Sequence, residues 1–99
     1  MLRAATQPFK GGSLTNAGRA LTKHPEVLGF TKDTLRQSLR SDAALNAAAE
    51  GAIGGILRSG SSMVKSLPRY GNVIEVQGGS GFGARWSEAT GEFIGFINP

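Results

Sequence analysis

The chain has a single histidine, His24, and histidine is the side chain best suited to move a proton near neutral pH. His24 follows Lys23 and precedes Pro25, so it stands where a predicted helix ends. A lone histidine is often only a packing or surface residue. In the catalytic interpretation, His24 acts as a general acid or base. No second histidine and no cysteine is present to replace it in that role.

A second group of chemical interest is basic and lies between positions 58 and 85, where Glu75 is the only acid. Alternation along strands predicts that Lys65 and Arg85 share one face of a sheet, and a Pro-Arg-Tyr-Gly turn places Tyr70 beside a cation. RNA recognition uses such cations and aromatic rings to hold phosphates and to stack bases. The alternative interpretation is charge that only maintains solubility. The group consists of Arg58, Lys65, Arg69 and Arg85.

The composition narrows the chemistry further. The 99 residues include 11 Lys and Arg against 7 Asp and Glu, a net charge of +4, with no Cys. The absence of Cys excludes a disulfide framework, a Cys-based zinc site, an iron–sulfur cluster and a thiol nucleophile. The acids are scattered without the spacing of metal ligands, so we expect no metal site and no cofactor. The positive charge favours an anionic partner such as nucleic acid, an acidic protein or a membrane surface.

The elements that must position these residues change character near position 60. Helical spacing and capping residues predict helices from Ser13 or Thr15 to position 23, over 31–39 and over 41–60. Period-two alternation predicts strands at 73–77, 83–86 and 93–97, with a fourth at 63–67. Short connections favour antiparallel pairing. The predicted fold is therefore α+β, with N-terminal helices packed on a small antiparallel sheet, and Trp86 faces the core if Arg85 faces a cleft.

The ends and boundaries of the chain carry few signals. Residues 1–12 contain no apolar run of signal-peptide length and end in two glycines, so we predict a linker or fragment start followed by one domain over 13–99. The most apolar segment, 43–57, is interrupted by Asn46 and Glu50 and is shorter than a bilayer requires. We expect no membrane span.

Several phrases of the sequence resemble a known family, and together they run from the first helix to the last strand. The chain resembles the C-terminal toxin domains of contact-dependent growth inhibition (CdiA-type) proteins and related polymorphic toxins. More specifically, it is similar to the ribonuclease toxins of the barnase/EndoU/colicin/RelE (BECR) superfamily. The phrases are GRALTKHPE at 18–26, LPRYG at 67–71, GARW at 83–86 and TGEFIGF at 90–96.

The resemblance implies a fold, an activity and partners. Such domains place N-terminal helices before a twisted antiparallel sheet whose concave face holds the active site. They cleave RNA without a metal, and many cut tRNA in the anticodon loop. They travel as the tip of a large cell-surface effector into the cytoplasm of a neighbouring bacterium. A cognate immunity protein blocks them, and we expect a monomer outside that complex.

The resemblance also suggests catalytic roles, because metal-free cleavage needs a base for the 2′-hydroxyl, cations for the charged phosphorane and a donor for the leaving oxygen. His24 would exchange the proton, and Arg85 would hold the scissile phosphate. Tyr70 would stack a base or donate a proton, and Thr90 would hydrogen-bond the phosphate. The products would be a 2′,3′-cyclic phosphate and a 5′-hydroxyl.

The remaining basic residues are expected to bind RNA. Arg69 would help Arg85 hold the phosphate, and the others would supply positive charge to the substrate. This RNA-binding group consists of Lys23, Arg58, Lys65 and Arg69. Three other functions stay open at this point: a non-catalytic RNA-binding module, a metal-dependent DNase toxin, and a membrane-active toxin built around the helix containing 43–57.

Overall fold

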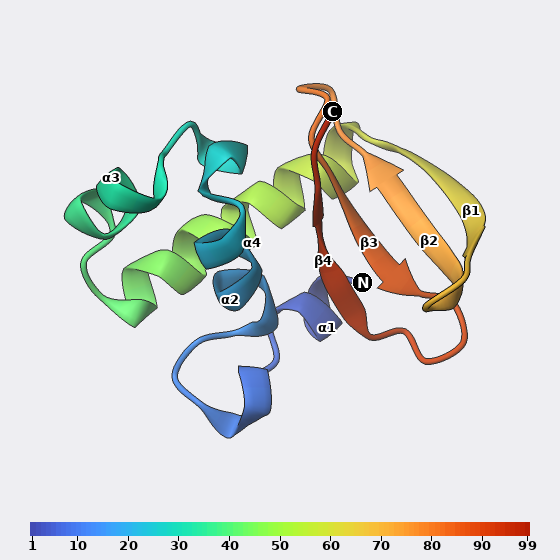
Figure 1. Cartoon of the computed structure of the whole chain (residues 1–99), viewed down its shortest axis with the longest axis horizontal. Helices are drawn as coiled ribbons and strands as arrows, with labels where there is room; N and C mark the ends of the chain where they lie inside the picture. Colours follow the sequence, from blue (N-terminus) through green and yellow to red (C-terminus); the bar gives the residue numbers. More distant parts are fainter.

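Helices fill the first sixty residues of the chain and strands fill most of the remainder, as the two periodicities predict. A computed structural model describes residues 1–99 (Figure 1). The helical elements are α1 (Leu2–Ala5), η1 (Phe9–Gly11), α2 (Asn16–Lys23), η2 (Pro25–Leu28), α3 (Lys32–Ser38) and α4 (Asp42–Ser59). The strands are β1 (Ser61–Leu67), β2 (Gly71–Gln77), β3 (Gly83–Ser87) and β4 (Phe93–Ile97). The α+β prediction is confirmed.

The helices begin where hydroxyl side chains cap them. The Thr15 hydroxyl accepts a hydrogen bond from the backbone of the third helical residue of α2, and the Ser41 hydroxyl does the same for α4. Thr31 begins α3 with a reciprocal capping box that involves Thr34. Pro25 ends α2, because the residue before a proline avoids the helical region and His24 accordingly has φ −130° and ψ 61°.

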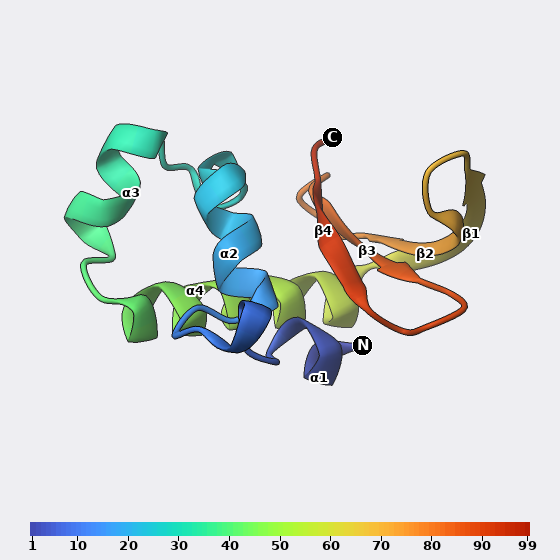
Figure 2. The same cartoon turned by 60° about the horizontal axis from the view of Figure 1, so that its bottom comes forward.

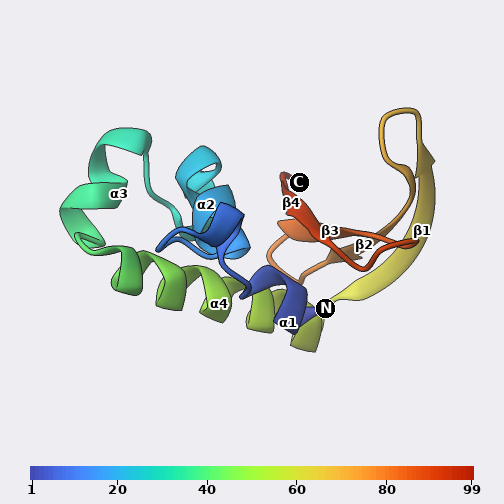
Figure 3. The ribbon, with the colours of Figure 1, turned by 90° about the horizontal axis from the view of Figure 1, so that it is seen from below.

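The four strands form a meander in the order β1-β2-β3-β4, and every pair is antiparallel. Glu75 pairs with Arg85 between β2 and β3, and a bulge follows Arg85 so that Trp86 pairs with Phe93 of β4. Figures 2 and 3 show α4 running along the base of the molecule, with α2 and α3 above it and the sheet rising beside its C-terminal end. The edge strand β4 is therefore the strand nearest α2, which it contacts.

The hydrophobic core lies between α4, α2 and one face of the sheet. Trp86 is only 1% exposed, and its ring meets Phe93 edge-on with 5.4 Å between ring centroids. Arg85, its neighbour in β3, points to the opposite face of the sheet, as the alternation predicts. The buried members of the core cluster are Ala5, Ala17, Leu21, Leu35, Leu45, Ala49, Ile53, Ile56, Val76, Ala84, Trp86 and Phe96.

Residues 1–12, expected to be a linker or fragment start, pack on this core in the structure. Ala5 of α1 is fully buried, the Trp86 indole N–H donates to the Met1 carbonyl at 2.9 Å, and the Asn16 amide donates to the Ala4 carbonyl at 3.0 Å. The difference has a physical reason. A four-residue helix is too short to show a period, and its stabilising partners lie far away in the sequence. No helix combines the length and apolar character needed to cross a membrane.

Candidate functional site

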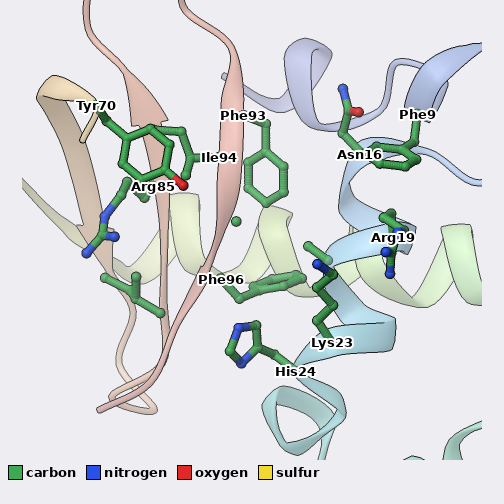
Figure 4. A pocket seen from close by; sticks show the side chains of 13 residues that line it. Phe9, Asn16, Arg19, Lys23, His24, Tyr70, Arg85, Phe93, Ile94 and Phe96 are labelled. Atoms are coloured by element: carbon green, nitrogen blue, oxygen red, sulfur yellow. The ribbon is translucent and has the colours of Figure 1, made fainter.

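A pocket of about 300 Å³ lies between α2 and β4 and extends to Arg85 of β3 and to Tyr70 (Figure 4). In Figure 4, Tyr70 and Arg85 lie on one side of β4, and Lys23 and His24 lie on the other. We call the side formed by η1, α2 and its C-cap His24 the helix wall, and the side formed by Tyr70, Arg85 and β4 the sheet wall. The pocket therefore combines cations, an imidazole and a phenol over an apolar floor that includes Phe96.

The helix wall carries a histidine that is held by an acid. His24 Nδ1 lies 3.1 Å from Glu26 Oε2, across the turn that Pro25 imposes. Both side chains are about two-fifths exposed, at 40% and 42%. A hydrogen bond from its own backbone N–H and the bond to His24 lower the pKa of the Glu26 carboxyl. An ionised carboxylate only accepts, so Nδ1 of the ring donates to Glu26, and Nε2 is the ring nitrogen left without a partner.

The cations of the helix wall have no acidic partner. Arg19 and Lys23 are one turn apart on α2, so they share a face and both line the pocket. Neither belongs to any ion pair of the structure. The Arg19 guanidinium lies over the ring of Phe9, 5.4 Å from its centroid, and Phe9 comes from the segment expected to be a linker.

Arg85 of the sheet wall shares one acid with Lys65, which stands on the same face of the sheet but outside the pocket. Arg85 Nε donates to Glu75 at 2.8 Å, and Lys65 Nζ lies 3.2 Å from the other oxygen of the same carboxylate. The Glu75 side chain is only 6% exposed. Burial alone would raise its pKa, but the bonds to Arg85 and Lys65 outweigh burial and lower the pKa below the ordinary value. Lys65 and Arg85 do share a face, but much of their charge is already neutralised.

The structure brings only some of the predicted catalytic residues together. His24, Tyr70 and Arg85 line the pocket, whereas Thr90 does not. Thr90 lies exposed in the turn before β4, and its hydroxyl accepts a hydrogen bond from the Glu92 backbone at 3.2 Å. That bond holds the turn and gives Thr90 a local structural role.

The predicted RNA-binding residues divide in the same way. Lys23 lines the pocket, whereas Arg58, Lys65 and Arg69 do not. Arg58 is exposed in the last turn of α4. Arg69 is exposed, and its guanidinium lies 5.6 Å from the centre of the Tyr70 ring at the rim. Arg69 could therefore contact a ligand of the pocket only at the rim, beside Tyr70.

Sequence reasoning missed Phe9, Asn16, Arg19 and Glu26 as residues of the site. The signal for Glu26 was present, because a single proline separates it from His24 and a turn there brings the two side chains together. The signal for Arg19 was its i, i+4 spacing from Lys23. No comparable pattern marked Phe9. The structure contains no group of three or more His, Asp or Glu side chains arranged to hold a metal ion.

Comparison with known proteins gives one match. A family model described as the CdiA C-terminal tRNase toxin domain matches residues 2–98. No curated protein and no solved structure matches the chain. The matched range includes α1, η1 and both walls of the pocket.

Proposed function

The chain belongs to the CdiA C-terminal tRNase toxin domain family, as the sequence resemblance predicts, and from that membership we propose a specific reaction. We propose that the domain is a metal-independent endoribonuclease, without a cofactor, that cleaves tRNA and prefers the anticodon loop. The observation that carries the proposal is the contact of His24 Nδ1 with Glu26, which leaves Nε2 free in a pocket that Arg85 also lines.

The residues of the pocket supply the parts of this reaction. His24 Nε2 takes the proton of the ribose 2′-hydroxyl, and the 2′-oxygen attacks the adjacent phosphorus. The Arg85 guanidinium stabilises the charge of the phosphorane. The phosphorus–O5′ bond breaks, and the Tyr70 hydroxyl donates a proton to the leaving oxygen. The products are a 2′,3′-cyclic phosphate and a 5′-hydroxyl. The proton of the 2′-hydroxyl is then on His24, and the proton of the new 5′-hydroxyl comes from Tyr70.

The test is incubation of the purified domain with total tRNA in EDTA, followed by sequencing of the RNA ends. We expect discrete fragments that end in 2′,3′-cyclic phosphate, and no cleavage of a DNA strand of the same sequence, which lacks the 2′-hydroxyl. Intact RNA with a salt-sensitive mobility shift would contradict the proposal and favour a binding module. Cleavage that EDTA abolishes would contradict metal independence and favour a metal-dependent nuclease.

Family membership also supports a proposal about partners. We propose that a cognate immunity protein binds the domain, and that the domain is otherwise monomeric. We propose that it is delivered to the cytoplasm of a target bacterium from a large surface effector. Co-expression of the neighbouring open reading frame tests the first point, because an immunity protein restores growth of cells that make the toxin. Growth arrest that no neighbouring gene relieves would contradict it.

A further inference from the structure

Arg19 is held in place on the helix wall although it has no charge partner. Its guanidinium lies over the Phe9 ring, 5.4 Å from the ring centre, and its Nη1 donates to the Thr22 hydroxyl at 3.1 Å. An arginine fixed at two points has already lost much of the rotamer freedom that binding would otherwise cost. The remaining N–H donors of Arg19 have no partner in the structure.

The geometry of Arg19 favours one kind of ligand. The guanidinium lies over the Phe9 ring and Nη1 donates to Thr22, so Nε and Nη2 keep N–H donors without a partner. The N–H donors of a guanidinium form a planar fork that matches the oxygens of a phosphate. Lys23 stands one turn further along the same face of α2 and is exposed, so a second positive charge follows the first. Two spaced cations of this kind track the backbone of a single strand.

We propose that Arg19 and Lys23 form a phosphate subsite for a nucleotide that flanks the cleaved bond of a single-stranded RNA, and that Phe9 positions Arg19. The proposal rests on the proposed function and adds to it a second phosphate position. Arg19 comes from α2 and Arg85 from β3, on opposite sides of β4 in Figure 4, and we assign Arg85 and His24 to the reacting phosphate and Arg19 to a neighbouring one. The helix wall then sets the path of the strand, and Arg85 serves the reacting phosphate.

The test measures RNA binding without cleavage, in the His24→Ala background. Fluorescence anisotropy of a fluorescein-labelled single-stranded RNA gives the Kd over a range of salt concentrations. Loss of one phosphate contact lowers the slope of log K against log salt by about 0.7, which is about fivefold in Kd at 0.1 M salt. We expect this loss for Arg19→Gln. The matched control is Arg40→Gln, the same change at an exposed residue outside the pocket, which should leave the Kd unchanged.

Phe9 requires its own variant, because its ring lines the pocket itself and the proposal gives it a role through Arg19. Phe9→Leu keeps apolar volume and removes the ring, so we expect weaker binding. Its effect should disappear in the Arg19→Gln background. Full additivity of the two changes would overturn the positioning role. Thermal melts identify any variant that fails to fold. If Arg19→Gln fails, Arg19→Lys replaces it. This variant keeps the charge, so we expect weaker binding with an unchanged salt slope.

Oligonucleotides with single neutral methylphosphonate linkages identify the ligand group. A neutral linkage at the position that Arg19 contacts should weaken binding to the protein that has Arg19. The same linkage should not change binding to the Arg19→Gln variant. If Arg19→Gln binds as tightly as its parent while the wild-type domain still cleaves RNA, the subsite is wrong and the proposed function stands. If the wild-type domain binds RNA through Arg19 but leaves it intact, the proposed function fails and the subsite stands.

Discussion

On the sheet wall of the pocket, Arg85 contacts the nearly buried carboxylate of Glu75, which Lys65 also contacts, whereas on the helix wall Arg19 and Lys23 contact no acid. The sequence suggests the opposite distribution, because the segment from 58 to 85 is rich in basic residues and contains a single acid. That single acid lies where it pairs with both cations of its face. A count of basic residues therefore overstates the positive charge that a stretch of sheet offers to a ligand.

The two carboxylates of the site, Glu26 beside His24 and Glu75 beside Arg85, differ in a similar way. Glu26 is partly exposed and contacts a group that can lose its proton, whereas Glu75 is buried and contacts groups that stay charged. The first arrangement leaves a nitrogen free for chemistry, and the second fixes a side chain in place. We expect changes at His24 and Glu26 to alter activity, and a change at Glu75 to alter stability first.

The largest effect is expected for His24→Ala. Removal of a general acid or base costs about 10²–10⁴-fold in kcat, and His24 has no second histidine to replace it. The measurement is single-turnover cleavage of tRNA, with a thermal melt as the control for folding. If the variant keeps full activity, His24 takes no part in the chemistry, and the helix wall does not differ from the sheet wall in the way described.

The next largest effect is expected for Glu75→Gln on the sheet wall. Loss of the carboxylate leaves Arg85 and Lys65 without their common partner, and we expect unfolding to become easier by roughly 1–3 kcal/mol. This loss of stability is smaller than for a fully buried ion pair, because the side chains of Lys65 and Arg85 are both partly exposed to water. Urea denaturation measures it. In the same variant the two cations become free, so RNA binding at low salt should tighten, and weaker binding would contradict the neutralisation described for this wall.

A smaller effect on activity is expected for Glu26→Gln. The amide no longer favours the tautomer that exposes Nε2, so kcat should fall by roughly tenfold, less than for His24→Ala, with KM nearly unchanged. Cleavage kinetics measure both constants. Glu50→Gln, the same change at an exposed position of α4, is the matched control. Equal losses in the two variants would mean that the carboxylate acts through net charge and not by positioning His24.

The smallest effect concerns pH. The pKa of Glu75 in the folded chain lies below its ordinary value of 4.5, so the unfolded chain binds the proton more readily. The stabilisation is therefore fully present above pH 4.5 and is lost as the pH falls through the folded pKa. Urea midpoints from pH 7 downward should fall less steeply in Glu75→Gln than in the wild type. Parallel curves would show that the sheet wall does not contribute to acid sensitivity.

Local signals made the elements predictable from the sequence. Caps at Thr15, Thr31 and Ser41 and the stop at Pro25 act within a few residues, so their effects can be read along the chain. Alternation likewise assigned opposite faces to the two neighbours in β3. Alternation does not set strand register, so the pairing of Glu75 with a cation could not be predicted.

The missing parts of the site depend on contacts between distant segments. Phe9 and Arg19 meet only after the N-terminal segment has folded back beside α2, and no periodic pattern marks such a return. The contact of Glu26 with His24 is local, but it depends on the turn geometry that Pro25 imposes. Sequence reasoning therefore located His24 and Arg85 and left out the residues that hold the helix wall in position.

Trp86 is the only tryptophan of the chain, and its indole N–H donates to the Met1 carbonyl. The molecule thus contains an intrinsic fluorescent probe at the junction between its first residue and its core. Release of the N-terminal segment would expose the indole to water, and its emission would move to longer wavelength. The docking of the segment that supplies Phe9 can therefore be followed optically, without any added label.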